Sequence, residues 1–185
     1  MIMASSQKVL LAYGTRYGST RTIAREIAAF LEEQGIEPVI VDLKKTNMKN
    51  LGPMNQYSGV IVGASVAMFR VVRKAKNFLK KYHQEIKNAG IPLVYWITAS
   101  TAIESPDEAL EKFANPFLEK QDIRPDITIA IEPCMNMAEN NGKMTKMICE
   151  GMAEDLGVEY NPGGMNDYRD KERFKKFLDS LLNLF

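Results

Sequence analysis

The chain has 185 residues, of which 45% are hydrophobic and 25% are charged. This composition is that of an ordinary globular protein, and the length favours one domain over residues 1–185. Lysine and arginine number 24 against 23 acidic residues, so the net charge of +1 gives no argument for binding nucleic acid. The two cysteines, Cys134 and Cys149, are too few for a disulfide framework, and their spacing predicts no zinc or other metal site.

The longest apolar runs are far shorter than the roughly 20 residues that cross a membrane, so no membrane span is predicted. The first residues, MIMASSQKV, contain no apolar stretch of the length typical of a signal peptide. Few cysteines and no signal together favour a cytoplasmic location.

Short apolar stretches alternate with amphipathic ones along most of the chain. Five buried strands are predicted, at Lys8–Tyr13, Glu37–Leu43, Tyr57–Ala64, Ile91–Thr98 and Asp126–Glu132. The alternation predicts an α/β domain that is doubly wound, with a five-stranded parallel sheet between two layers of helices.

Helix boundaries are marked by capping residues and glycines. The helix after the first strand is expected to end at Gly35, and the one after the third strand at Gly90. Ser105 is expected to cap the next helix, with Glu108 completing a capping box. Pro116 lies inside the apolar pattern of that helix and should kink or end it.

Residues 133–169 interrupt the simple alternation between the fifth strand and the last helix. They contain a predicted helix at Lys143–Leu156, the pair Gly163-Gly164 and several methionines. The segment is too short for a core of its own, so it is interpreted as an insertion and not as a second domain. Because it follows the fifth strand, it is expected at the edge of the sheet where ligands bind.

In an open parallel sheet, ligands bind beyond the carboxyl ends of the strands. The first such loop, Gly14–Thr20, contains three hydroxyl side chains and leads directly into a helix. Hydroxyls and free backbone N–H groups at a helix start favour a phosphate, and Gly18 lets the backbone approach it closely. Ordinary helix capping by Ser19 or Thr20 is the alternative interpretation.

Other nucleotide-binding folds lack their motifs here. The chain has no G-x-G-x-x-G and no G-K-S/T, so neither a dinucleotide site nor a nucleotide-hydrolysing phosphate loop is predicted. The first and third strands end in Ala12-Tyr13 and Gly63-Ala64-Ser65 and not in the acidic residues of a phosphoacceptor site.

The motif Thr15-x-x-Gly18-x-Thr20, the stretches TRYGSTRTIAREIA and VIVGAS, and the long segment after the fifth strand resemble the flavodoxin family. Within that family the chain is most similar to the branch that includes menaquinone-dependent protoporphyrinogen oxidase. The resemblance implies a flavodoxin-like fold with strand order 2-1-3-4-5 and FMN as the cofactor. It places the FMN phosphate in the first loop and the flavin ring between the loops after the third and fourth strands.

By this resemblance three loops supply the cofactor-binding residues, and no side chain is expected to be catalytic. The residues are Thr15, Arg16, Tyr17, Gly18, Ser19 and Thr20, then Ser65, Val66, Ala67, Met68 and Phe69, and finally Thr98, Ala99, Ser100, Thr101 and Ala102. Phe69 or Met68 could form one wall of the flavin site, whereas the third loop has no aromatic residue. The second loop has no glycine after Gly63, so left-handed backbone should be unfavourable there.

These observations favour an FMN-binding electron carrier. One alternative is a flavoenzyme of the protoporphyrinogen-oxidase type that passes electrons to a quinone, and another is a phosphate-ligand binding module without redox activity. The expected partners are an acidic redox protein that docks near Arg70, Arg73 and Lys74, or a quinone or porphyrinogen. A solvated helix face is the alternative for this basic stretch. Either a monomer or a homodimer is expected.

Overall fold

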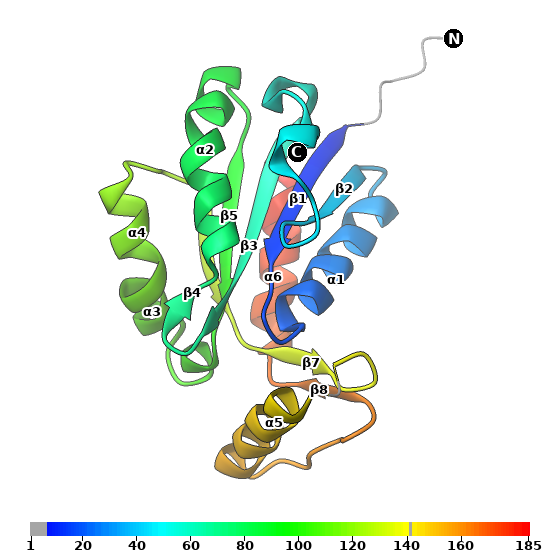
Figure 1. Ribbon diagram of the computed structural model, residues 1–185. Coiled ribbons are helices and arrows are strands. Elements are labelled where there is room, and N and C mark those ends of the chain that lie inside the picture. The colour runs from blue at the N-terminus through cyan, green and yellow to red at the C-terminus, as the bar shows by residue number, and fades with distance from the viewer. Residues whose placement is uncertain (1–6, 141) are drawn as a thin grey trace.

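The computed structural model describes residues 7–140 and 142–185, so residues 1–6 of the predicted domain and residue 141 of the predicted insertion lie outside it. A parallel sheet separates two layers of helices (Figure 1). The strands are β1 (Lys8–Gly14), β2 (Glu37–Asp42), β3 (Gly59–Ala67), β5 (Leu93–Thr98) and β6 (Ile127–Ile131). Their spatial order is β2-β1-β3-β5-β6, which confirms the predicted order 2-1-3-4-5 of the five main strands.

Each face of the sheet is covered by its own helices. Helices α1 (Ser19–Glu33) and α6 (Lys171–Leu182) pack on one face, and α2 (Arg73–Ala89), α3 (Pro106–Ala109), η4 (Leu110–Ala114) and α4 (Asn115–Lys120) pack on the other. Short 3₁₀ turns complete the crossovers, namely η1 (Met48–Leu51), η2 (Met54–Gln56) and η3 (Ser100–Ile103).

The inner strands β1, β3 and β5 are largely apolar runs, and both of their faces are buried. In β1, Val9 and Leu11 join the core beneath α1 and α6, whereas Leu10 and Ala12 join the core beneath α2. Alternate side chains of a strand point to opposite faces, so one run of apolar residues supplies both cores.

The third helical region begins at the predicted cap, Ser105, but does not end at Pro116. The Oγ of Ser105 accepts a hydrogen bond from the backbone N–H of Glu108 at 3.2 Å, as a helix cap should. The chain continues past Pro116, because a π-helical segment, η4, precedes it and places the proline in the first turn of α4. A proline in a first turn removes no hydrogen bond, so the helix does not end at Pro116, and the predicted disruption takes the form of the π-helical segment before it.

The third strand runs further than predicted. It extends to Ala67 and folds back as β4 (Arg70–Val71), with Val66 opposite Val71 and Ala67 opposite Arg70. Residues 66–71, here called the hairpin, therefore form a small antiparallel ribbon where the sequence predicts an irregular loop.

The insertion consists of α5 (Lys143–Leu156) and two short antiparallel strands, β7 (Cys134–Asn136) and β8 (Met165–Asp167). It lies beyond the carboxyl edge of the sheet, at the bottom of Figure 1. Met135, Met137 and Cys149 form a small satellite core there. Within the described residues, none of the helices combines the length and apolar character that a membrane crossing requires.

Candidate functional site

A cavity of about 380 Å³ lies at the carboxyl edge of the sheet, between the loops after β1 and β5, the hairpin and the insertion. Its volume falls within the roughly 300–1,000 Å³ typical of small-molecule sites. We call it the central cavity. The described residues that line it are all uncharged: Thr15, Tyr17, Ser19, Ser65, Val66, Ala67, Met68, Phe69, Thr98, Ala99, Ser100, Thr101, Phe113, Pro133, Met135, Met144, Ile148 and Met152.

The loop after β1 leaves the N-terminus of α1 without a side-chain cap. Gly18 adopts a left-handed conformation, with φ at 89°, and its N–H donates to the Oγ1 of Thr15 at 3.0 Å. No side chain caps α1, so the capping alternative for Ser19 and Thr20 does not hold. The first N–H groups of a helix have no partner within it, and together with the helix dipole they favour an anion.

Two buried hydroxyls at this edge have no hydrogen-bond partner among the described residues. They are the Oγ1 atoms of Thr20, the last residue of the first loop, and of Thr98, which lines the central cavity. An unsatisfied buried hydroxyl costs free energy, about 1–3 kcal/mol, that a bound polar ligand would recover. Thr20 fits a phosphate at the start of α1, and Thr98 fits a polar ring edge.

Three other hydroxyls hold the loops together. The Oγ of Ser19 accepts from the backbone N–H of Cys134 at 2.8 Å and thereby ties α1 to the insertion. The Oγ of Ser65 accepts from the backbone N–H of Arg16 at 3.2 Å, and Thr15 is bonded to Gly18 as described above. Each of these hydroxyls is used as an acceptor, so its own proton is still available to a ligand.

A loop of the insertion covers the start of α1. The Asn140 side chain lies over Gly18 so closely that a Cβ on this glycine would be 2.3 Å from the amide. The Oδ1 of Asn140 accepts from Arg21 at 2.8 Å, and Glu139 forms an ion pair with Arg25 at 2.7 Å. The insertion thus contacts the first loop through both its backbone and its side chains.

The tip of the hairpin is strained and exposed. Met68 and Phe69 both have left-handed backbone, with φ of 49° and 59°, although neither is glycine. Such a conformation costs a non-glycine residue roughly 1–2 kcal/mol. Their side chains are 71% and 79% exposed. Strain and exposed apolar surface at one tip indicate a functional position, because neither stabilises the isolated chain.

The insertion supplies an apolar wall of the central cavity, here called the methionine wall. Met144, Ile148 and Met152 follow one another at four-residue intervals on α5, and Met135 is added from β7. The adjacent stripe of α5, including Cys149, faces the satellite core. Thioether side chains pack well against aromatic rings, so this wall suits a flat ligand.

Most of the predicted cofactor-binding residues line the central cavity. Arg16 instead lines a second depression, and Gly18 and Thr20 belong to the first loop without lining the central cavity. Ala102 is fully buried in the core beneath α2 and does not line the central cavity, so its role as a contact residue stays a prediction.

Six lining residues were not predicted from the sequence: Phe113, Pro133, Met135, Met144, Ile148 and Met152. The spacing of the three on α5 was a usable signal, because residues four apart share a helix face. Phe113, Pro133 and Met135 carried no comparable signal, because only the tertiary fold brings them to this edge.

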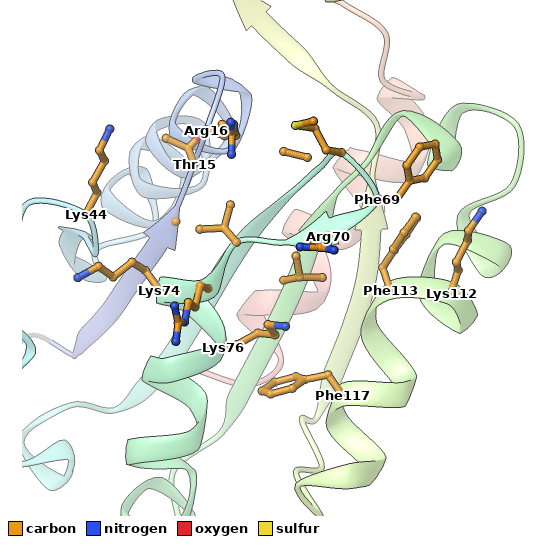
Figure 2. Close-up of a pocket in the computed structure, with 16 residues that line it drawn as sticks. Thr15, Arg16, Lys44, Phe69, Arg70, Lys74, Lys76, Lys112, Phe113 and Phe117 are labelled. Carbon is orange, nitrogen blue, oxygen red and sulfur yellow. The ribbon is translucent and has the colours of Figure 1, made fainter.

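The second depression, here called the basic groove, has a volume of about 1,200 Å³ and lies on the other side of the hairpin. It contains the predicted docking residues Arg70, Arg73 and Lys74. Four further cations line it, namely Arg16, Lys44, Lys76 and Lys112 (Figure 2).

The Cys134 thiol is buried at this edge of the sheet. Burial raises the pKa of the Cys134 thiol to about 12, which keeps it protonated and unreactive at neutral pH. Among the described residues, no three His, Cys, Asp or Glu side chains come together as a metal site would require. The central cavity therefore offers a binding site whose described lining side chains are uncharged.

Residues 10–130 of the sequence match the family described as "Flavodoxin domain". Among solved structures, a cysteine-to-serine mutant of flavodoxin from Pseudomonas aeruginosa is 13% identical, with a TM-score of 0.51 over 82% of this chain and 97% of that one. The Flv1 flavodiiron core from Synechocystis sp. PCC6803 is 17% identical, with a TM-score of 0.52 over 96% of this chain but 37% of that one. At these identities the likeness shows the fold. No curated protein matched the sequence.

Proposed function

The chain belongs to the Flavodoxin domain family, and from this premise we propose that it binds FMN in the central cavity and acts as an electron-transfer protein. The observation that carries the proposal is that a helix N-terminus without a side-chain cap meets the loops after β3 and β5 at one uncharged cavity. An anionic group fits the start of the helix, and a neutral ring fits the rest of the central cavity.

The proposal assigns a role to each wall. The first loop and Thr20 hold the phosphate, with the α1 N–H groups as further donors. The hairpin tip and the methionine wall enclose the ring, and Thr98 donates to its polar edge. When bound, FMN supplies the electron-transfer chemistry, and the protein supplies binding, orientation and exclusion of water.

The test is the absorption spectrum of the purified protein, followed by identification of the flavin released on denaturation. The expected result is a yellow protein that releases one FMN per chain, or an apoprotein that becomes yellow when FMN is added. A colourless protein that binds inorganic phosphate but no flavin would instead favour a phosphate-ligand module.

One observation favours a second candidate, an FMN-dependent oxidoreductase. The insertion walls the central cavity with methionines, so a small substrate would meet the flavin inside a pocket and not on an open face. The resemblance in sequence suggests oxidation of a porphyrinogen, with the electrons passed to a quinone. Anaerobic mixing of protoporphyrinogen, a quinone and the FMN-loaded protein tests this: multiple turnovers would establish the enzyme, and a lack of porphyrin formation would leave the carrier.

A further inference from the structure

The basic groove concentrates positive charge far above the average of the chain. Seven cations line it, whereas the whole sequence has a net charge of only +1. No Asp or Glu is among the described residues that line the groove. The ion pairs found within residues 7–140 and 142–185 involve other side chains.

These cations come from separate parts of the chain. Arg16 follows β1, Lys44 follows β2, and Lys112 belongs to η4, whereas Arg70 to Lys76 extend from β4 into α2. A solvated helix face would draw its charges from one helix alone. Bringing like charges together from distant segments costs free energy, so the arrangement favours an anionic partner that offsets their repulsion.

Aromatic rings lie beside the cations. The Nζ of Lys112 is 5.5 Å from the ring centres of both Phe69 and Phe113, and the Nζ of Lys76 is 5.8 Å from that of Phe117 (Figure 2). Beside them is the exposed hairpin tip. An apolar centre with a charged surround is the usual anatomy of a protein interface, in which exposed aromatic residues provide much of the binding energy.

We propose that the basic groove docks the acidic surface of a redox protein partner, with the Met68–Phe69 tip as its apolar anchor. The inference rests on the proposed function, since the partner would exchange electrons with FMN in the central cavity. The two depressions share Thr15, Ala67, Met68, Phe69 and Phe113, so the hairpin is their common wall. A partner in the groove would therefore contact the other side of the flavin site.

A protein surface fits the groove better than other anions do. The volume of about 1,200 Å³ exceeds the roughly 300–1,000 Å³ of small-molecule pockets. A flat bilayer would not follow a concave surface. Of the three rings only that of Phe69 is exposed, since Phe113 is buried and Phe117 is half-buried, so the groove lacks the row of open rings on which successive bases of a nucleic acid stack.

The test compares two double variants with the same change in net charge. Arg70→Glu with Lys74→Glu reverses charge inside the groove, and Lys80→Glu with Lys81→Glu reverses it on exposed residues of α2 outside the groove. The probes are a labelled dodecaglutamate peptide, followed by fluorescence anisotropy, and a small acidic [2Fe–2S] protein as electron donor, followed by stopped-flow absorption. The groove variant should lose about tenfold or more in peptide affinity and in the second-order rate of electron transfer, and its salt dependence should weaken. The α2 variant should lose less than about twofold.

Equal losses in the two variants, or no binding of either probe to the unmodified chain, would overturn the proposal. So would tighter binding, at the same salt concentration, of single-stranded RNA or of phosphatidylglycerol vesicles than of the acidic probes. FMN titration of each variant separates the two claims: a chain that binds the peptide but no FMN refutes the proposed function and retains the acidic docking surface. For the groove variant, the proposal predicts that FMN binding is retained while peptide binding and electron transfer are weakened.

Discussion

The two depressions on either side of the hairpin differ sharply in charge. The central cavity is lined by uncharged residues, whereas seven of the sixteen that line the basic groove are cations. The two depressions are neighbours separated only by the hairpin, so their difference in charge does not follow from where they lie in the fold. Under the two proposals, the cavity would retain a largely neutral ring by packing and a few hydroxyls, and the groove would select a partner by charge. Substitutions of residues that line only one of the two depressions should leave the function of the other unchanged.

The largest effect is expected from Gly18→Ala. An added Cβ would strain a residue with φ at 89° and would collide with Asn140. Loss of two phosphate hydrogen bonds, each worth roughly 1.5–3 kcal/mol, should weaken FMN binding about a hundredfold or more. Fluorescence titration of the apoprotein with FMN measures this loss, and binding of the dodecaglutamate peptide should be unaffected.

Gly35→Ala is the matched control for backbone strain. Gly35 has φ at 77°, and a Cβ there would meet nothing within 4 Å. Both variants should lose roughly 1 kcal/mol of unfolding free energy, but Gly35→Ala should bind FMN normally. A similar loss of affinity in both variants would show that general destabilisation, and not the first loop, governs FMN binding.

Thr20→Val should have the next largest effect. It removes a buried hydroxyl that has no partner among the described residues, so the apoprotein should be as stable as before or more stable. FMN affinity should fall about tenfold. Thr22→Val is the control, because the Thr22 hydroxyl donates to the carbonyl of Gly18 at 3.4 Å and is already used within α1. If Thr20→Val left FMN affinity unchanged, Thr20 would not be a phosphate ligand.

Met152→Ala should give a smaller loss, about three- to tenfold in FMN affinity, because it removes one thioether contact worth roughly 0.3–1.5 kcal/mol. It should also open the site, so that iodide quenches the fluorescence of bound flavin more strongly. Met147→Ala is the control on the same helix, since Met147 is 60% exposed and does not line the cavity. Equal effects of the two variants would remove α5 from the flavin site.

The contrast between the first loop and the methionine wall shows what the sequence could predict. The first loop is local: its glycine, hydroxyls and following helix are adjacent in the chain, and the pattern identified them. The inner strands were likewise evident, because burial on both faces leaves nearly continuous apolar runs. The residues of the wall become neighbours of the loop only through tertiary contacts such as Ser19 with Cys134.

The sequence did not predict the hairpin, for a different reason. Two-residue hairpin turns usually contain asparagine or glycine, and here Met68 and Phe69 occupy those positions at a cost in strain. The strands β7 and β8 are three residues each, too short for a periodic signal. Features that violate local propensity are visible only in the folded chain, and they lie at the edge where function is proposed.

The smallest effect concerns stability and the attachment of the insertion. Arg169, whose side chain is 7% exposed, bridges Glu26 of α1 at 2.8 Å and Asp167 of β8 at 2.7 Å. Burial opposes ionisation of Asp167, but its contacts with Arg169 outweigh burial and lower the pKa of this carboxyl. A lowered pKa means that the stabilisation is complete at neutral pH and is lost as the pH falls below about 3.9, the ordinary value.

Asp167→Asn should therefore cost roughly 1–2 kcal/mol of unfolding free energy at neutral pH, and less at about pH 3. Denaturant unfolding at both pH values measures the difference. Asp179→Asn, on an exposed residue of α6, should change the free energy by less than about 0.5 kcal/mol at either pH. A cost for Asp167→Asn that stayed constant or grew on acidification would contradict the sign of the pKa shift.

The central claim is that the start of α1 binds the phosphate of FMN while the central cavity holds the ring. Parallel titrations of the apoprotein with FMN and with riboflavin, which lacks the phosphate, test it most directly. We predict that FMN binds at least about a hundredfold more tightly than riboflavin, since two or more charged hydrogen bonds are at stake. Thr20→Val should narrow that gap by weakening FMN alone. Comparable affinities of the unmodified chain for the two flavins would contradict the account.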